Sequence, residues 1–234
     1  MPFYVNEATI IPRPETEYMI TAVGERLKQQ KKSDFSLLLD IGTGSGVLGI
    51  SLLLQHPDTF REVYLTDISP AALEVAKKNY ATLITQPQQY ETHFLQSDLA
   101  AFMSTEAFEH QRKKAVQTNG HIVLVANLPY IPDETFDTNA LEQMQKREPR
   151  LAFVGGNDGL ALYRTMFAQI KPLRETGKLS HQSFMLFLEM MTRQVEILQA
   201  EFGERIHFEE VKTFHFNIRI VQATVVSQEN KKEQ

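Results

Sequence analysis

Residues 35–46 read FSLLLDIGTGSG, a short apolar run that passes directly into a turn with three glycines. The apolar run has the length of one strand and does not alternate with polar residues, which is typical of a strand buried on both faces. The apolar segment VLGISLLLQH follows and stops before Pro57. Residues 35–57 therefore predict a strand, a glycine turn and a helix in that order.

The rest of the chain continues this alternation. Further strands are predicted at 62–67, 90–96, 121–126 and 183–189, and helices at 14–32, 70–80, 100–120, up to about 170, and 192–202. Two β-rich segments, 206–213 and 217–226, read as a closing antiparallel hairpin. The pattern predicts an α/β fold with a doubly wound, mostly parallel seven-stranded sheet and helices on both faces.

The composition indicates one globular domain. The 234 residues include 24 Lys+Arg and 29 Asp+Glu, which gives a formal net charge of −5. This acidic balance is unfavourable for non-specific nucleic-acid binding, in which Lys and Arg neutralise phosphates. We find no internal repeat or linker, and we expect a single domain over residues 1–226 and a disordered tail at 227–234.

Several classes of site are excluded or disfavoured. The chain has no cysteine, so disulfides and zinc–thiolate sites are excluded, and its 7 histidines form no HxxxH pair. We therefore expect no metal site. The N-terminus lacks the pattern of a signal peptide, and no segment approaches the roughly 20 apolar residues of a membrane span. We expect a cytoplasmic protein that does not bind membranes.

The glycine turn is a candidate binding loop. Glycines allow a backbone to approach a ligand closely, and the following helix presents unpaired N–H groups. The GxGxG spacing differs from the dinucleotide-binding GxGxxG, and the Lys-Ser/Thr of a phosphate-binding loop is absent. A strand-to-helix turn that binds nothing can have the same glycines, but the flanking strand and helix favour binding. The candidate residues are Asp40, Gly42, Thr43, Gly44, Ser45 and Gly46.

Two acidic residues follow later strands. Asp67 ends the second predicted strand, where a carboxylate can accept hydrogen bonds from a ribose diol. It could instead interact favourably with the N-terminus of the next helix. Asp98 follows the third strand and could accept from an adenine amino group, with Leu99 packing on the ring, although Asp is also common in turns.

A third candidate is Asn127-Leu128-Pro129-Tyr130, directly after the strand 121–126. Ligands of open α/β sheets bind beyond the carboxyl ends of strands, which is where this tetrapeptide falls. Asn127 and the Leu128 carbonyl offer acceptors, Pro129 keeps Leu128 extended, and Tyr130 offers a flat face. Together these features describe a clamp for a planar NH2 group, and a simple turn with a packed tyrosine is the competing interpretation.

These three motifs together resemble class I S-adenosylmethionine-dependent methyltransferases that methylate amino groups. Two further stretches are similar to signatures of the HemK/PrmC-type release factor glutamine methyltransferases. They are Ile11-Pro-Arg-Pro-Glu-Thr-Glu17 and Glu148-Pro-Arg-Leu-Ala-Phe-Val-Gly-Gly-Asn-Asp-Gly159. Phe216-Asn-Ile-Arg-Ile-Val221 resembles the closing hairpin of that family, so the resemblance runs from about residue 3 to residue 225.

The resemblance implies methyl transfer from S-adenosylmethionine to the side-chain amide nitrogen of a glutamine, in the Gly-Gly-Gln loop of a peptide chain release factor. By the same resemblance, the glycine loop and Asp67 would hold the methionine and ribose parts of the cofactor, and Asp98 and Leu99 would flank its adenine. Asn127, next to the cofactor, would clamp the glutamine amide together with the rest of its tetrapeptide. The segment 1–32 would line the cleft, with its entrance shaped by Arg13, Glu15 and Thr16.

Two features depart from the family pattern. Leu128 stands where the family usually has a first proline, a form also seen in rRNA adenine dimethylases. Bacterial members also carry an N-terminal helical domain implicated in docking the release factor. Only about ten residues precede the Pro-Arg-Pro motif here, so we expect a catalytic domain without that docking domain.

Two other functions therefore stay open. One is an adenine-N6 methyltransferase that uses the same clamp on a flipped base of RNA or DNA. Its sequence support is the basic run Gln111-Arg-Lys-Lys114, which a solvated helix end explains better. The other is a non-catalytic module that binds the cofactor while Leu128 disables the clamp.

Overall fold

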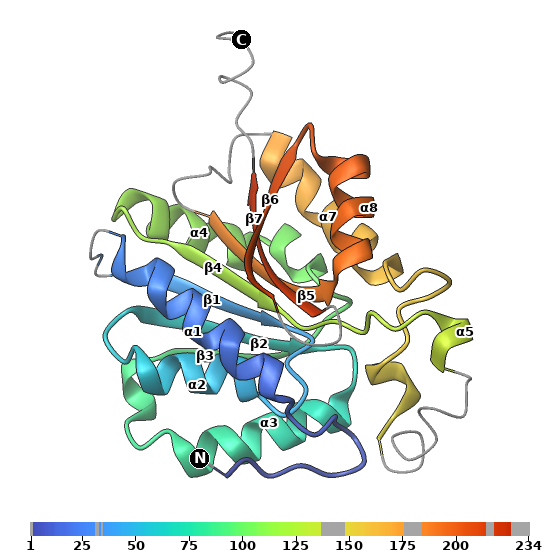
Figure 1. The fold of residues 1–234 in the computed structure, drawn as a ribbon. Coiled ribbons are helices and arrows are strands. Elements are labelled where there is room, and N and C mark those ends of the chain that lie inside the picture. The colour runs from blue at the N-terminus through green and yellow to red at the C-terminus, as the bar shows by residue number, and fades with distance from the viewer. Residues whose placement is uncertain are drawn as a thin grey trace, which may run out of the picture.

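The computed structural model describes residues 2–30, 33, 35–136, 148–175, 184–213 and 218–225. Within them a seven-stranded sheet lies between two layers of helices (Figure 1). Its strands are β1 (Ser36–Ile41), β2 (Phe60–Asp67), β3 (Glu91–Gln96), β4 (Ile122–Ala126), β5 (Phe184–Met191), β6 (Ile206–Thr213) and β7 (Ile218–Val225). The helices are α1 (Pro14–Lys28), α2 (Val47–Gln55), α3 (Pro70–Leu83), α4 (Glu106–Gln117), α5 (Asp133–Phe136), α7 (Ala161–Glu175) and α8 (Thr192–Phe202).

The strand order is β3-β2-β1-β4-β5-β7-β6. The first five strands pair in parallel, whereas β7 is antiparallel to both β5 and β6. This arrangement confirms the predicted doubly wound sheet and its closing antiparallel hairpin.

Two apolar clusters hold the helices against the sheet. All six residues of β1 are buried, as the unbroken apolar run predicts. Leu38 belongs to a cluster that also takes side chains from α1, α2 and α3. Leu37 and Leu39 point to the opposite face, into a cluster shared with α4, α7 and α8. The alternation along β1 therefore joins both layers into one core.

The strand order changes direction beside β1. From β1 the chain winds outward through β2 and β3, and it then returns to place β4 on the other side. Ligands of open α/β sheets usually bind at such a point, beyond the carboxyl ends of the two strands. Ile41 pairs with Ala126, so the glycine loop and Asn127 leave the sheet side by side.

The helix starts follow the sequence signals. Pro14 occupies the first turn of α1 after an extended Arg13, and the Ser69 hydroxyl accepts a hydrogen bond from the Ala72 N–H at the start of α3. Both starts agree with the predictions.

Four helix boundaries differ from prediction, and one of them is the end of α3, at Leu83 and not at residue 80. α1 ends at Lys28, before the predicted end at residue 32. The predicted helix 100–120 is divided into a 3₁₀ turn, Ala101–Ser104, and α4, because Thr105 is extended and its hydroxyl caps the Phe108 N–H. α7 continues past 170 to Glu175 and includes Pro172.

Two sequence-based expectations receive only limited tests. The predicted tail at 227–234 lies outside the described residues. Among the helices that are described, none combines the length and the apolar composition that crossing a membrane requires.

Candidate active site

The glycine loop turns sharply between β1 and α2. Gly42, Gly44 and Gly46 have φ angles of +70°, +55° and +81°, a region that residues with a Cβ rarely adopt. A Cβ at Gly44 would meet no atom within 4 Å, so this glycine borders open space where a ligand could lie. A Cβ at Gly46 would lie 2.7 Å from Ile50, so that glycine is required by packing. Thr43 and Ser45 are buried.

Asp40 shapes this loop from inside the protein. It is 1% exposed, and its Oδ2 accepts hydrogen bonds from the Thr43 hydroxyl at 2.7 Å and the Gly49 N–H at 2.9 Å. Burial raises the pKa of Asp40 to about 6, although these hydrogen bonds oppose the shift. In this structure Asp40 therefore supports the loop from behind.

Asp67 lies at the carboxyl end of β2, against the glycine loop. Its Oδ2 accepts from the Gly44 N–H and its Oδ1 from the Ser69 N–H, both at 2.9 Å. Burial raises the pKa of Asp67, and these backbone hydrogen bonds act in the opposite direction. A carboxylate has about four lone-pair positions, so each oxygen retains one for a ligand hydroxyl. The geometry therefore fits the predicted ribose contact.

The predicted adenine-flanking pair lies beside Asp67. The Ser97 N–H donates to the Asp67 carbonyl at 3.0 Å, which places the end of β3 next to β2. Asp98 is exposed, and Leu99 has a φ of +49°, which is uncommon for a leucine. Gln169 of α7 holds this turn by hydrogen bonds to the Asp98 carbonyl and the Ala100 N–H.

The tetrapeptide Asn127–Tyr130 leaves β4 on the other side of the glycine loop. Leu128 is 2% exposed, and its Cδ2 would lie 3.0 Å from a Cβ at Gly42. The side chain that differs from the family pattern therefore packs against the glycine loop. The Tyr130 hydroxyl donates to Glu189 Oε1 at 2.9 Å.

The predicted signature 148–159 packs against this tetrapeptide. Ile131 forms a parallel bridge with Val154, and its N–H donates to the Phe153 carbonyl at 2.8 Å. A Cβ at Gly155 would collide with the Pro129 carbonyl oxygen, and a Cβ at Gly159 would collide with the Tyr130 carbonyl oxygen. These glycines are therefore needed for the close approach of two backbone segments.

The N-terminal signature 11–17 contacts the signature 148–159. Arg13 Nη2 lies 2.8 Å from Glu148 Oε1, and the Ile11 N–H donates to Glu148 Oε2 at 2.8 Å. Thr16 is buried, and Glu15 is near enough to Glu189 for its negative charge to raise the pKa of that carboxyl. The structure thus brings the glycine loop, the tetrapeptide and both signatures together at the carboxyl edge of the sheet, whereas the start of the predicted motif 216–221 lies outside the described residues.

Glu189 is a site residue that the sequence reasoning missed. It is 2% exposed at the carboxyl end of β5, and its Oε2 has no hydrogen-bond partner among the described residues. Burial raises its pKa to about 7. The available signal was a single acid in the apolar run FMLFLEMM.

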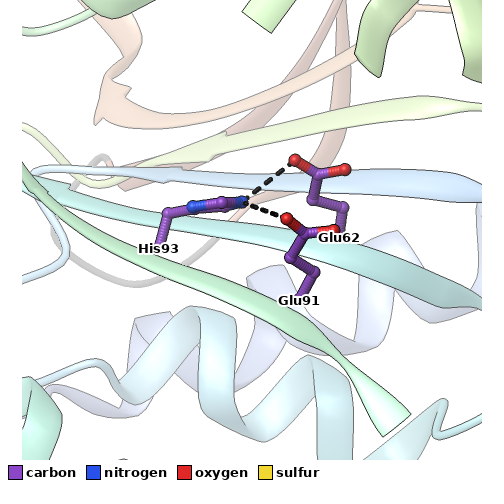
Figure 2. Close-up of side chains that lie close together, drawn as sticks. All are labelled: Glu62, Glu91 and His93. Atoms are coloured by element: carbon purple, nitrogen blue, oxygen red, sulfur yellow. Dashed lines mark hydrogen bonds and ion pairs between the residues drawn. The ribbon is translucent and has the colours of Figure 1, made fainter. Parts of the chain in front are cut away.

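A cluster of three side chains with the spacing of metal ligands lies outside the candidate active site. Within the described ranges, Glu62, Glu91 and His93 have ligand atoms within 4.8 Å of one another (Figure 2). They come from the amino-terminal parts of β2 and β3, away from Asp67. Glu62 Oε1 already lies 2.5 Å from the Tyr64 hydroxyl and 3.0 Å from His93 Nε2, whereas its buried Oε2 has no hydrogen-bond partner among the described residues.

The chain has the fold of class I methyltransferases. Residues 23–110 match the family described as Methyltransferase small domain. The structure also resembles solved methyltransferases, including the Thermus thermophilus 16S rRNA N2 G1207 enzyme in complex with AdoMet and guanosine. That comparison has a TM-score of 0.52 and 16% identity, and covers 92% of this chain and 44% of the other.

The sequence comparisons point to a more specific group of methyltransferases. The chain is 38% identical over 169 residues to the release factor glutamine methyltransferase of Bacillus anthracis, covering 72% of this chain and 53% of the relative. It is 32% identical over 203 residues to that of Lactococcus lactis, covering 86% and 63%. The chain is thus similar to release factor glutamine methyltransferases over most of its own length, and it spans about half to two thirds of the length of these relatives.

Proposed function

We propose that this chain transfers a methyl group from S-adenosylmethionine to the side-chain amide nitrogen (N5) of a glutamine in a protein. The observation that carries the proposal is the pairing of Ile41 with Ala126, because it sets the glycine loop directly beside the Asn127–Tyr130 clamp. A methyl donor held by the glycine loop and a glutamine amide held by the clamp would meet at the carboxyl edge of the sheet. The glutamine in the Gly-Gly-Gln loop of a peptide chain release factor is the substrate we favour, and it implies a cytoplasmic reaction.

The residues present fit S-adenosylmethionine. Gly44 borders open space at the start of α2, and Asp67 is held by two backbone N–H groups with lone pairs to spare. Asp67 would hold the ribose hydroxyls, the glycine loop would accommodate the methionine part, and Asp98 with Leu99 would flank the adenine. The bound cofactor supplies an electrophilic methyl group.

The clamp would prepare the acceptor nitrogen. An amide nitrogen is a poor nucleophile because its lone pair is delocalised into the carbonyl. Hydrogen bonds from its NH2 to Asn127 Oδ1 and to the Leu128 carbonyl would orient the nitrogen and favour a pyramidal, more reactive geometry. The proton can leave after methyl transfer, from a far more acidic product, so no base is needed before attack.

Two observations favour a protein substrate over a nucleic acid. The signatures 11–17 and 148–159, which resemble the glutamine-modifying family, lie against the clamp. The net charge of −5 is unfavourable for binding phosphates. A glutamine flanked by glycines can also enter a narrow cleft, because its neighbours have no side chains.

The test is transfer of labelled methyl groups to four substrates at matched salt: intact release factor, its Gln→Ala variant, rRNA and DNA. We expect label on the intact release factor and none on the Gln→Ala variant. Label on nucleic acid but not on release factor would favour the adenine-N6 alternative and contradict the proposal. Cofactor binding without transfer to any substrate would indicate a binding module.

A further inference from the structure

Glu189 and Asn127 meet at the ends of neighbouring strands. The parallel register pairs Ala126 of β4 with Leu188 of β5, so the next residue on each strand is Asn127 and Glu189. Oε1 of Glu189 accepts from the Tyr130 hydroxyl, whereas its buried Oε2 has no partner among the described residues. A buried polar atom without a partner is costly, and such atoms in native proteins call for an explanation.

Hydrogen-bond chemistry restricts how Asn127 can face this carboxyl. The NH2 of an asparagine only donates and its Oδ1 only accepts, while an ionised carboxylate only accepts. Asn127 can therefore turn only its NH2 toward an ionised Glu189. The Asn127 side chain lies close enough to Glu189 to lower the pKa of this carboxyl, the direction expected when an NH2 group faces the ionised form. Oδ1 is then left as the acceptor that a substrate amide needs.

We propose that Glu189 is a positioning residue for methyl transfer, whose carboxylate holds Asn127 with Oδ1 toward the acceptor nitrogen and fixes Tyr130 through its hydroxyl. The inference rests on the proposed function, because Asn127 must act on an amide NH2. A protonated Glu189 carries an O–H that can donate to Asn127 Oδ1 and occupy that acceptor. The ionised carboxylate is therefore the active form.

The surroundings of Glu189 place its ionisation near neutral pH. Burial raises its pKa to about 7, with a further contribution from the charge of Glu15 on α1. The hydrogen bond from Tyr130 and the nearby Asn127 side chain act in the opposite direction. Tyr163 of α7 donates to the Glu189 backbone carbonyl, and the facing residue on β7 is the apolar Ile220. Activity is expected to rise with pH through about 7.

The direct test follows the Asn127 side chain itself. The ¹⁵N–¹H signals of its NH2 group, identified by their loss in Asn127→Asp, are recorded from pH 5.5 to 8.5 with cofactor bound. We expect them to shift with a midpoint near 7 in the wild-type protein and to show no such titration in Glu189→Gln. Signals that do not change with pH in the wild type would overturn the proposal. This measurement needs no substrate, so it tests the hold of Glu189 on Asn127 separately from the proposed function.

The kinetic test compares Glu189→Gln with Glu196→Gln, a matched change at an exposed position on α8. Misplacement of one positioning group can cost about 10²-fold in rate, so we expect kcat of Glu189→Gln to fall roughly 10- to 100-fold and to lose its pH dependence near 7. Cofactor affinity should stay within about twofold, as for a group that does not contact the cofactor. A Glu189→Gln profile like that of Glu196→Gln would overturn the proposal.

A second variant covers the case in which Glu189→Gln does not fold, as judged by its Tm. Glu189→Asp retains the carboxylate on a side chain one methylene shorter. We expect it to keep a rise in kcat with pH at a lower plateau. Full wild-type activity without any pH dependence in Glu189→Asp would contradict a positioning role.

Discussion

Arg13 Nη2 lies 2.8 Å from Glu148 Oε1 and 3.0 Å from Glu148 Oε2, so one guanidinium group joins two motifs that are far apart in the chain. The Arg13 side chain is 31% exposed, whereas that of Glu148 is only 5% exposed. Glu148 also accepts from the Ile11 N–H. The pair fixes the segment before α1 against the loop that packs on the clamp.

The first prediction concerns this pair. Arg13→Ala should loosen the end of this segment nearest Arg13, because Glu148 then holds it only through the Ile11 N–H, whereas Tyr4 keeps its hydrogen bonds with Asn79. A partly buried pair of this kind is expected to contribute about 1 kcal/mol, between exposed and fully buried pairs. A double-mutant cycle of Arg13→Ala and Glu148→Gln in urea unfolding measures the coupling, and hydrogen exchange of residues 2–13 measures the release. Additive effects and unchanged exchange would show that the pair does not hold the segment.

The second prediction is that cofactor affinity depends on Asp67. Asp67→Ala removes charge-assisted hydrogen bonds to the ribose, each contributing roughly 1.5–3 kcal/mol. The affinity for S-adenosylmethionine, measured by calorimetry, should fall about tenfold or more. Asp58→Ala, at an exposed position before β2, is the control and should bind normally. Equal affinities of the two variants would remove Asp67 from the site.

The parts of the fold that could be predicted carry local signals. The run FSLLLD, the three glycines and the Ser69-Pro70 helix start each fix a local conformation, and alternating strands and helices then allow few topologies. The partnership of Arg13 with Glu148 could not be derived, because it depends on how distant loops meet. Glu189 was missed for a similar reason: one acid in an apolar strand has no periodicity, and its role appears only when β5 lies beside β4.

The third prediction separates the binding of the substrate amide from the binding of the cofactor. Asn127→Ala should abolish transfer and leave cofactor affinity nearly intact, because Asn127 is assigned to the substrate amide. Loss of one preorganised polar contact typically costs about 10²–10³ in rate. Single-turnover transfer to release factor and calorimetry with S-adenosylmethionine measure the two effects. Near-normal turnover in this variant would show that the tetrapeptide is not a clamp.

The fourth prediction concerns Leu128. The carbonyl is the group assigned to the substrate, so Leu128→Pro should retain transfer activity. The Leu128 side chain, however, is 2% exposed and packs toward Gly42. A proline fills less of this space, so we expect a loss of about 1–3 kcal/mol in the free energy of unfolding. Urea unfolding and initial rates at equal folded concentration separate the two effects. An inactive but folded variant would assign the leucine side chain a direct role.

The last prediction is a pH dependence of stability. Burial raises the pKa of Asp40 to about 6 and that of Glu189 to about 7, from ordinary values near 4 in the unfolded chain. Between these values the folded state binds more protons than the unfolded state, so the contribution of both groups to the free energy of unfolding falls as pH rises from about 4 to 7. For Glu189 the loss should be on the order of 1–3 kcal/mol.

This loss is measured as the difference in the free energy of unfolding between wild type and Glu189→Gln in urea at pH 4.5 and pH 8, with Glu196→Gln as control. Glu189→Gln should gain stability relative to the wild type as pH rises, whereas Glu196→Gln should not. A difference that is the same at both pH values would mean that Glu189 titrates alike in the folded and unfolded chains, in conflict with its burial.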